Sequence, residues 1–249
     1  MNSLGQQPGA GWHASPNFND RRHGGTPDMV VLHHTAMRTA RLALDRLCDP
    51  APPDGLPPVS CHYLISETGQ VWQMVNETDR AWHAGQGAWG DVVDVNSHSI
   101  GIELANTSHH PFPEPQMVAL ETLLAGILGR WTIPPERVIA HSDMAPHRKS
   151  DPGARFDWMR LALAGLATWA IGEDGSARCS SADFSADLHR IGYRSSAAGG
   201  EDQDGLMLWA FRLRFRPWAA NGHTPLEARD CAIARELARL YPAAKGLAG

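Results

Sequence analysis

Short apolar runs separated by polar turns fill the first two thirds of the chain. This pattern is typical of strands, and we expect strands near 29–34, 62–66, 71–75, 98–104 and 137–141. Apolar residues recur at helical spacing over 116–131, and a second helix is expected over 158–170. Strands interspersed with helices predict an α/β fold, with a mixed central β-sheet flanked by helices.

The pattern changes after Ile171. Residues 172–176 combine glycine with acidic and small polar residues and indicate a linker. The region that follows has no strand pattern, and three helices in about seventy residues would form a small bundle. We therefore expect a first domain over 1–171, a linker over 172–176 and a small helical domain over 177–249.

Capping residues place the three C-terminal helices. Asp183 is expected to cap a helix that runs through Ile191, because short acidic side chains accept from the free amides of a helix start. A second helix is expected over 204–215. Residues 224–227 have the capping-box pattern, with proline at the first helical position, and predict a third helix that ends at Leu240.

Composition excludes several classes of function. The 249 residues have a net charge of only −5, which offers no basic surface for nucleic acid or for an anionic membrane. The longest apolar run, 161–171, is far shorter than the ~20 residues that cross a bilayer. The segment 1–9 lacks the features of a secretory signal, so we expect a cytoplasmic protein, or a periplasmic one if the sequence is a truncated piece.

Four cysteines stand at positions without CxxC spacing: Cys48, Cys61, Cys179 and Cys231. That arrangement fits reduced cytosolic thiols rather than a metal cluster. The sequence leaves open a second arrangement, in which Cys48 and Cys61 pair across the proline-rich segment between them.

The segment 141–153 combines three kinds of reactive side chain. His141 follows an apolar strand, and Lys149 and Asp151 follow within ten residues. Pro146 and the Asp-Pro-Gly sequence at 151–153 predict a loop here and argue against a helix. Side chains on such a loop at a strand end can point into a cleft.

A second histidine stands in similar surroundings, because His33 also ends an apolar strand. His33, His141 and Asp151 would form a set of two nitrogens and one oxygen, which suits one Zn²⁺ ion with a fourth position open for water. Each residue taken alone has a simpler interpretation, as a strand-end histidine or a turn aspartate. The combination is what favours a metal site.

Glu103 lies within the apolar run 98–106, where a carboxylate is costly to bury without a partner. We interpret it as the group that takes a proton from a water at the metal. Lys149 is better suited to stabilising a developing oxyanion than to binding a metal. The alternative is that Glu103 and Lys149 form an ordinary ion pair.

Several of these segments, in this order, resemble the zinc-dependent N-acetylmuramoyl-L-alanine amidases of the amidase-2 type, relatives of the peptidoglycan recognition proteins. The resemblance covers about residues 11–170 and is carried by 12–18, 31–36, 60–65, 81–85, 99–104 and 141–153. It implies metal ligands at His33, His141 and Asp151, a catalytic carboxylate at Glu103 and a catalytic lysine at Lys149.

The same resemblance implies an enzyme that hydrolyses the amide between N-acetylmuramic acid, or its 1,6-anhydro form, and L-alanine of the stem peptide. Its partners would be peptidoglycan fragments or murein, and we expect a monomer. The alternative is a recognition module that binds muropeptide without cutting it. Because the ligand and catalytic positions are all filled, the sequence favours the enzyme.

Three further sets of residues have open roles. Trp82 and His83 would lie beside the cleft and bind substrate, or would simply cover the core. His34 stands where the family often has tyrosine, and as the neighbour of His33 on a strand it should point away from the metal. The C-terminal region resembles three-helix peptidoglycan-binding domains. Three arginines there would contact an acidic stem peptide or solvate a helix end: Arg212, Arg214 and Arg216.

Overall fold

The computed structural model describes residues 7–172, 179–195, 202–221 and 224–243. Its centre is a six-stranded sheet in the order β1-β5-β4-β7-β3-β8. The strands are β1 (Gly11–Trp12), β5 (Val71–Gln73), β4 (Tyr63–Ile65), β7 (Ser99–Leu104), β3 (Met29–His34) and β8 (Val138–Ala140). Only β4 and β5 pair antiparallel in this sheet, so the predicted mixed α/β fold is confirmed.

A smaller antiparallel pair joins β2 (Phe18–Asp20) to β6 (Asp79–Ala81). The helices of the first two thirds are α1 (Ala40–Cys48), α2 (Val95–His98), α3 (Glu114–Trp131), α4 (His141–Met144) and α5 (Trp158–Leu163). The last three are α6 (Ser181–Ile191), α7 (Gln203–Phe215) and α8 (Ala228–Leu240). No helix within the described residues is long and apolar enough to cross a membrane.

Alternate residues of β3 pack against opposite layers, as the two-residue period of a strand requires. Val30 and Leu32 belong to a hydrophobic cluster with α3 and α5. Met29 and Val31 belong to a second cluster, which continues into α6, α7 and α8. Both faces of β3 are therefore buried, which explains why its sequence is a continuous apolar run.

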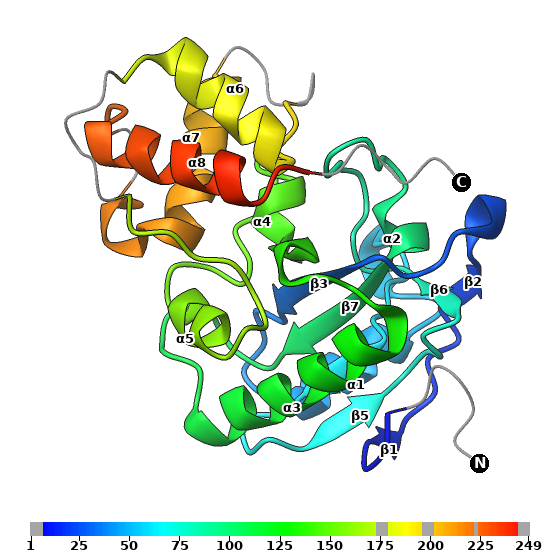
Figure 1. Ribbon diagram of the computed structural model, residues 1–249. Helices are drawn as coiled ribbons and strands as arrows, with labels where there is room; N and C mark the ends of the chain where they lie inside the picture. The colour runs from blue at the N-terminus through cyan, green and yellow to red at the C-terminus, as the bar shows by residue number, and fades with distance from the viewer. Residues whose placement is uncertain (1–6, 173–178, 196–201, 222–223, 244–249) are drawn as a thin grey trace.

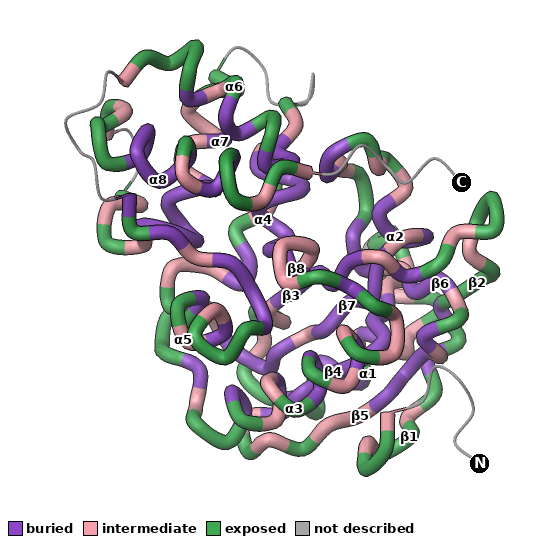
Figure 2. The backbone as a smooth tube through the Cα atoms, in the orientation of Figure 1, coloured by how far each residue is buried: buried purple, intermediate pink, exposed green. Residues whose placement is uncertain are grey.

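The C-terminal helices share a core with the sheet. Figure 1 shows α6, α7 and α8 grouped at one end of the molecule, with α4 between them and the sheet, and Figure 2 shows buried segments on both sides of that junction. One cluster contains Val31 of β3 and Met144 of α4 together with Phe211 and Leu237 of the last helices. The hydrophobic core is thus continuous from β3 to α8.

Several predicted boundaries were wrong for local reasons. The helix expected over 158–170 ends at Leu163, because the chain turns at Gly165 with a φ of +72°. The first C-terminal helix is capped by the Ser180 side chain, which accepts from the amide of Asp183, so Asp183 is in the first turn. The linker expected over 172–176 lies, apart from Gly172, outside the described residues.

The last helix begins at Ala228 and not at Pro225. Arg212 donates to the carbonyl oxygens of Thr224 and Pro225, at 3.1 and 2.8 Å, and holds this segment outside the helix. Glu227 becomes the N-cap, and its amide donates to Asp230. Helix α1, which the sequence analysis did not predict, is capped by the Thr39 side chain.

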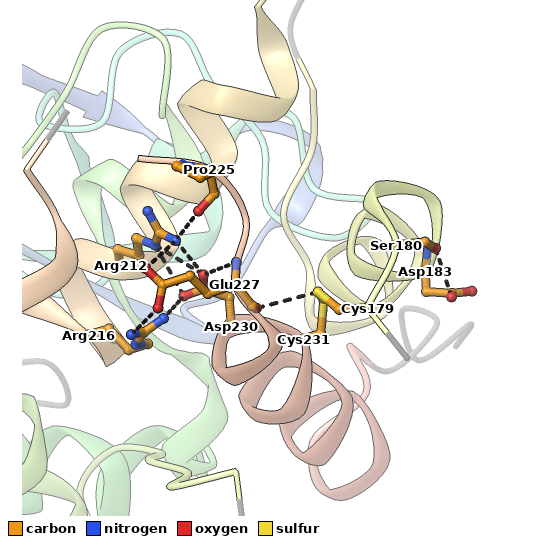
Figure 3. Close-up of a disulfide and its surroundings, with 9 residues drawn as sticks. All are labelled: Cys179, Ser180, Asp183, Arg212, Arg216, Pro225, Glu227, Asp230 and Cys231. Carbon is orange, nitrogen blue, oxygen red and sulfur yellow. Dashed lines mark hydrogen bonds and ion pairs between the residues drawn. A yellow bond between two sulfur atoms is a disulfide. The ribbon is translucent and has the colours of Figure 1, made fainter. Parts of the chain in front are cut away.

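Neither expectation for the arginines was correct, because all three are buried in ion pairs. Arg212 and Arg216 both bond Asp230, at 2.5 and 2.8 Å, as Figure 3 shows. Arg214 pairs with Asp143 at 2.7 Å. These guanidinium groups stabilise the packing of the C-terminal helices and are almost completely shielded from solvent.

The expectation of four reduced thiols was also wrong. Cys179 and Cys231 form a disulfide with a Cα–Cα distance of 5.6 Å, which joins the start of α6 to α8 (Figure 3). Cys48 and Cys61 are free, and the buried Cys61 thiol donates to the Tyr63 carbonyl oxygen. The pairing that the sequence left open between Cys48 and Cys61 is therefore not made.

Reduction of the disulfide should lower the stability of the wild-type protein by about 2–4 kcal/mol, since the bond closes a loop with a sequence separation of 52. The measurement is thermal unfolding with and without a thiol reductant. The control is the double variant Cys179→Ser, Cys231→Ser, which should unfold at one temperature in both buffers. A wild type insensitive to reductant would contradict the disulfide.

Candidate active site

Three adjacent parallel strands end at one edge of the sheet, and the candidate residues are gathered there. His33 of β3 is the direct register partner of Glu103 of β7. On the other side of β3, β8 ends at Ala140, and His141 follows at once. The carboxyl ends of parallel strands meet at the same edge, so this topology brings together residues far apart in the sequence.

The prediction that no helix forms after His141 was wrong, because this residue begins the short helix α4. Pro146 and the Asp-Pro-Gly turn end the helix only after Met144, so one helical turn forms before them. The Asp143 carboxylate accepts from the amide of Ala140 at 2.9 Å and so fixes the junction between β8 and α4. The direction of the His141 side chain is therefore set by a helical turn and not by a loop.

Two imidazoles and a carboxylate converge in this cluster. The Nδ1 atoms of His33 and His141 lie 2.8 Å apart, and each lies 3.0 Å from Asp151 Oδ2. All three residues are buried, at 1, 3 and 7 % exposure. Electron-rich atoms this close together and away from water need a proton or a metal cation between them. The cluster could therefore hold a metal ion.

The electrostatics of the cluster favour the protonation states that metal ligands need. Burial and the neighbouring His141 lower the pKa of His33 to about 4, so the ring is neutral at neutral pH. Burial alone would raise the pKa of Asp151, but His141 and His33 lower it well below its usual value. His141 Nε2 donates to the Ala84 carbonyl oxygen at 2.9 Å, which leaves its Nδ1 unprotonated toward the cluster.

The cluster forms one wall of a cleft of about 440 Å³ that Glu103 and Lys149 also line. Glu103 Oε2 is buried and has no hydrogen-bond partner. Burial and the charge of Asp151 raise the pKa of this carboxyl to about 8, although Lys149 opposes the shift. Within the described residues Glu103 and Lys149 form no ion pair, so the carboxyl faces the cleft without a fixed partner.

The remaining candidates occupy different positions. His83 lines the cleft but is mostly buried, and its Nδ1 lies 2.9 Å from Nε2 of His33. Trp82 is not among the residues that line the cleft, and its indole donates to Asn19 Oδ1 at 2.8 Å. His34 also lines the cleft, outside the ligand cluster, and its Nδ1 accepts from the amide of Ala36.

Comparison with known proteins places this arrangement in a family. Residues 23–154, which include all five ligand and catalytic candidates, match the amidase-2 family of N-acetylmuramoyl-L-alanine amidases. The chain belongs to this family. The resemblance seen in the sequence is therefore confirmed, and family members are hydrolases that act on an amide bond.

Among relatives of this amidase, AmiD of Escherichia coli (strain K12) is 34% identical over 208 residues, which are 74% of this chain and 75% of AmiD. The structure of AmiD in complex with the substrate anhydro-N-acetylmuramic acid-L-Ala-D-γ-Glu-L-Lys has a TM-score of 0.75 and 32% identity, and the match covers 88% of this chain and 92% of that one. AmpDh3 of Pseudomonas aeruginosa, in complex with anhydromuramic pentapeptide, has a TM-score of 0.76 and 29% identity, with 89% and 95% covered. These matches extend beyond the family segment into the C-terminal helices.

Sequence reasoning missed the group that anchors α4 of this amidase. Asp143, two residues after His141, accepts from the Tyr193 hydroxyl at 2.5 Å and from Arg214 at 2.7 Å. Asp143 and Tyr193 are fully buried, and Arg214 is 3 % exposed. Tyr193 and Arg214 belong to the C-terminal region, so that region fixes the helix that carries His141.

Replacing Arg214 by Met should lower the free energy of unfolding by about 3–5 kcal/mol, because Asp143 would stay buried without its cation. Arg41→Met is the matched control, since Arg41 is exposed and pairs with the exposed Asp45 on α1, and it should change stability by about 0–1 kcal/mol. The measurement is urea unfolding of the full chain. Equal losses of unfolding free energy in the two variants would show that the buried pair with Asp143 adds no more stability than an exposed ion pair.

Glu103→Gln should stabilise the metal-free protein increasingly as pH rises. The folded-state pKa of Glu103 is raised to about 8, so the unfolded chain releases its proton first and stability is lost between about pH 4.5 and 8. Glutamine removes that loss. We expect a gain of about 1–3 kcal/mol at pH 8.5 and little change at pH 4, measured by thermal unfolding in chelator. A gain independent of pH would contradict the burial of this carboxyl.

Proposed function

We propose that this chain hydrolyses the amide that joins N-acetylmuramic acid, or its 1,6-anhydro form, to L-alanine of the stem peptide. The observation that carries the proposal is the meeting of His33, His141 and Asp151 with Glu103 in one cleft. Relatives whose structures match over most of the chain are seen with anhydromuramyl peptides. A protein that only binds muropeptide would have no use for a complete ligand set beside a free carboxyl.

The donor set fits zinc. Two neutral imidazole nitrogens and one carboxylate oxygen, with a cleft on the open side, are the ligands of a catalytic zinc site. His33, His141 and Asp151 would hold the ion. When bound, it would supply Lewis acidity toward the scissile carbonyl and lower the pKa of a water toward ~7.

Glu103 would act as the proton carrier of the reaction. Its unpartnered Oε2 is at the cleft. Burial raises the pKa of this carboxyl to about 8 without a metal, and a cation at the ligand cluster would lower that pKa and favour the ionised form that can accept a proton. Glu103 would accept the proton of the attacking water and deliver it to the leaving amine of L-alanine. Lys149, on the same cleft wall, would offset the negative charge that develops on the carbonyl oxygen.

The disulfide bears on where the protein works. A bond between Cys179 and Cys231 persists in oxidising compartments and is rare in the cytosol, so it supports a periplasmic or extracellular site of action over the cytoplasmic one expected from the sequence. Because one chain supplies every residue of the proposed ligand set, we propose that the protein acts as a monomer. We propose muropeptides or murein as the partner.

The test is incubation of the purified protein with anhydromuropeptide and, separately, with intact sacculi, with free stem peptide followed by mass spectrometry. Release that a chelator abolishes and added zinc restores would support the proposal. Glu103→Ala should keep its zinc content and lose activity ~10²-fold or more. Binding of muropeptide without release of peptide would mean a recognition module, and full activity of Glu103→Ala would remove Glu103 from the mechanism.

A further inference from the structure

A buried chain of side chains runs from His33 away from the cleft. His33 Nε2 lies 2.9 Å from His83 Nδ1, and His83 Nε2 lies 3.2 Å from the Ser99 hydroxyl oxygen. Ser99 in turn donates to the carbonyl oxygen of Val95 at 2.6 Å. Ser99 is fully buried and His83 is 9 % exposed, so water does not replace these partners.

The Val95 carbonyl oxygen, at the end of this series of hydrogen bonds, determines which atom donates at each step. The Val95 carbonyl can only accept, so the single hydroxyl proton of Ser99 is directed to it. Ser99 must then accept from His83 Nε2, which leaves the Nδ1 of a neutral His83 as an acceptor. His33 must therefore donate through Nε2, and its Nδ1 faces His141 and Asp151 with a free lone pair.

We propose that His83 is a positioning residue that holds His33 in the tautomer able to bind the metal, and that Ser99 sets the orientation of His83. The inference rests on the proposed function, because it needs a metal at His33. Both ring nitrogens of His83 are used within the protein. No polar atom of His83 is then left for the substrate, which is the role that the sequence suggested.

The surrounding backbone is built to hold this ring. Asn96 Oδ1 accepts from the amides of His83 and Ala84, at 3.1 and 2.8 Å, and thereby fixes the segment that carries the ring. The ring packs against Gly101 of β7, where an added Cβ would be only 2.4 to 2.6 Å from three of its atoms. A side chain at position 101 would therefore displace His83 from His33.

The first test is zinc affinity, measured by competition with a chromophoric chelator on the full chain. His83→Ala should weaken zinc binding by about 10- to 100-fold. His83→Asn should recover part of this loss, because its amide oxygen can accept from His33 Nε2. The matched control is Gln116→Ala, which also removes a fully buried polar side chain, but one whose two hydrogen bonds go to the Ile65 and Ala105 carbonyl oxygens, away from the cluster and from His83. It should change zinc affinity by less than about threefold.

Ser99→Ala tests the far end of the chain and should weaken zinc binding by about three- to tenfold. Ser15→Ala is its control. Ser15 is also buried, and its hydroxyl donates to the Leu47 carbonyl oxygen at the same distance of 2.6 Å, but it is not hydrogen-bonded to the cluster. This control should leave zinc affinity unchanged. Equal losses in a variant and its control would show that only packing matters and would overturn the inference.

Ring tautomers give a readout that packing alone would not move. Long-range ¹H–¹⁵N correlation spectra of the zinc-loaded wild type should show the protons of His33 and His83 on Nε2. A proton on Nδ1 of His83 would refute the inference. If the wild type binds no zinc, the proposed function fails. If it binds zinc and His83→Ala binds it as tightly, only the role of His83 fails.

Discussion

The arrangement of this protein depends on one electrostatic constraint. Two imidazole nitrogens and a carboxylate oxygen are held about 3 Å apart in a buried position, where they repel one another unless a proton or a metal cation lies between them. Such a group does not form through local interactions alone. It must be imposed by the surrounding structure, and the parallel strands β3, β7 and β8, whose ends bring the residues together, supply most of that framework.

The C-terminal helices supply the rest of the framework that holds the ligand cluster in place. Their apolar side chains complete one face of the sheet, and their buried Arg214 and Tyr193 bond the Asp143 carboxylate beside His141. A region that only tethered the enzyme to its substrate would not need a fully buried ion pair with the catalytic part. The sequence pattern changes after Ile171, but the hydrophobic packing between the C-terminal helices and the sheet is continuous.

Sequence patterns predicted the parts of the site that follow from strand ends. Buried parallel strands are continuous apolar runs, so β3, β7 and β8 were visible, and with them His33, Glu103 and His141. The spacing of Ala40, Ala43, Leu44 and Leu47 after Thr39 also carried a helix signal, which was missed. The buried arginines carried no such signal: charged residues near a helix end suggest solvent unless the partner is known, and Asp143 lies 71 residues from Arg214. Pairing at that range is decided by tertiary packing alone.

Without a bound cation, the ligand cluster and Glu103 lower the stability of the fold, and this explains why surrounding hydrogen bonds are needed to hold them. Glu103 is held with its pKa raised to about 8, its Oε2 buried and unbonded, and the ligand lone pairs face one another. A cation in the cluster would relieve both conditions, because it attracts the lone pairs and favours the ionised carboxyl. Metal binding and folding would therefore be coupled, each stabilising the other. Without the ion, the hydrogen bonds that His83 Nδ1 and the Ala84 carbonyl oxygen accept from the two ligand histidines, together with the Asp143 anchor, must keep the ligands in place, which is why the layer behind the site is buried.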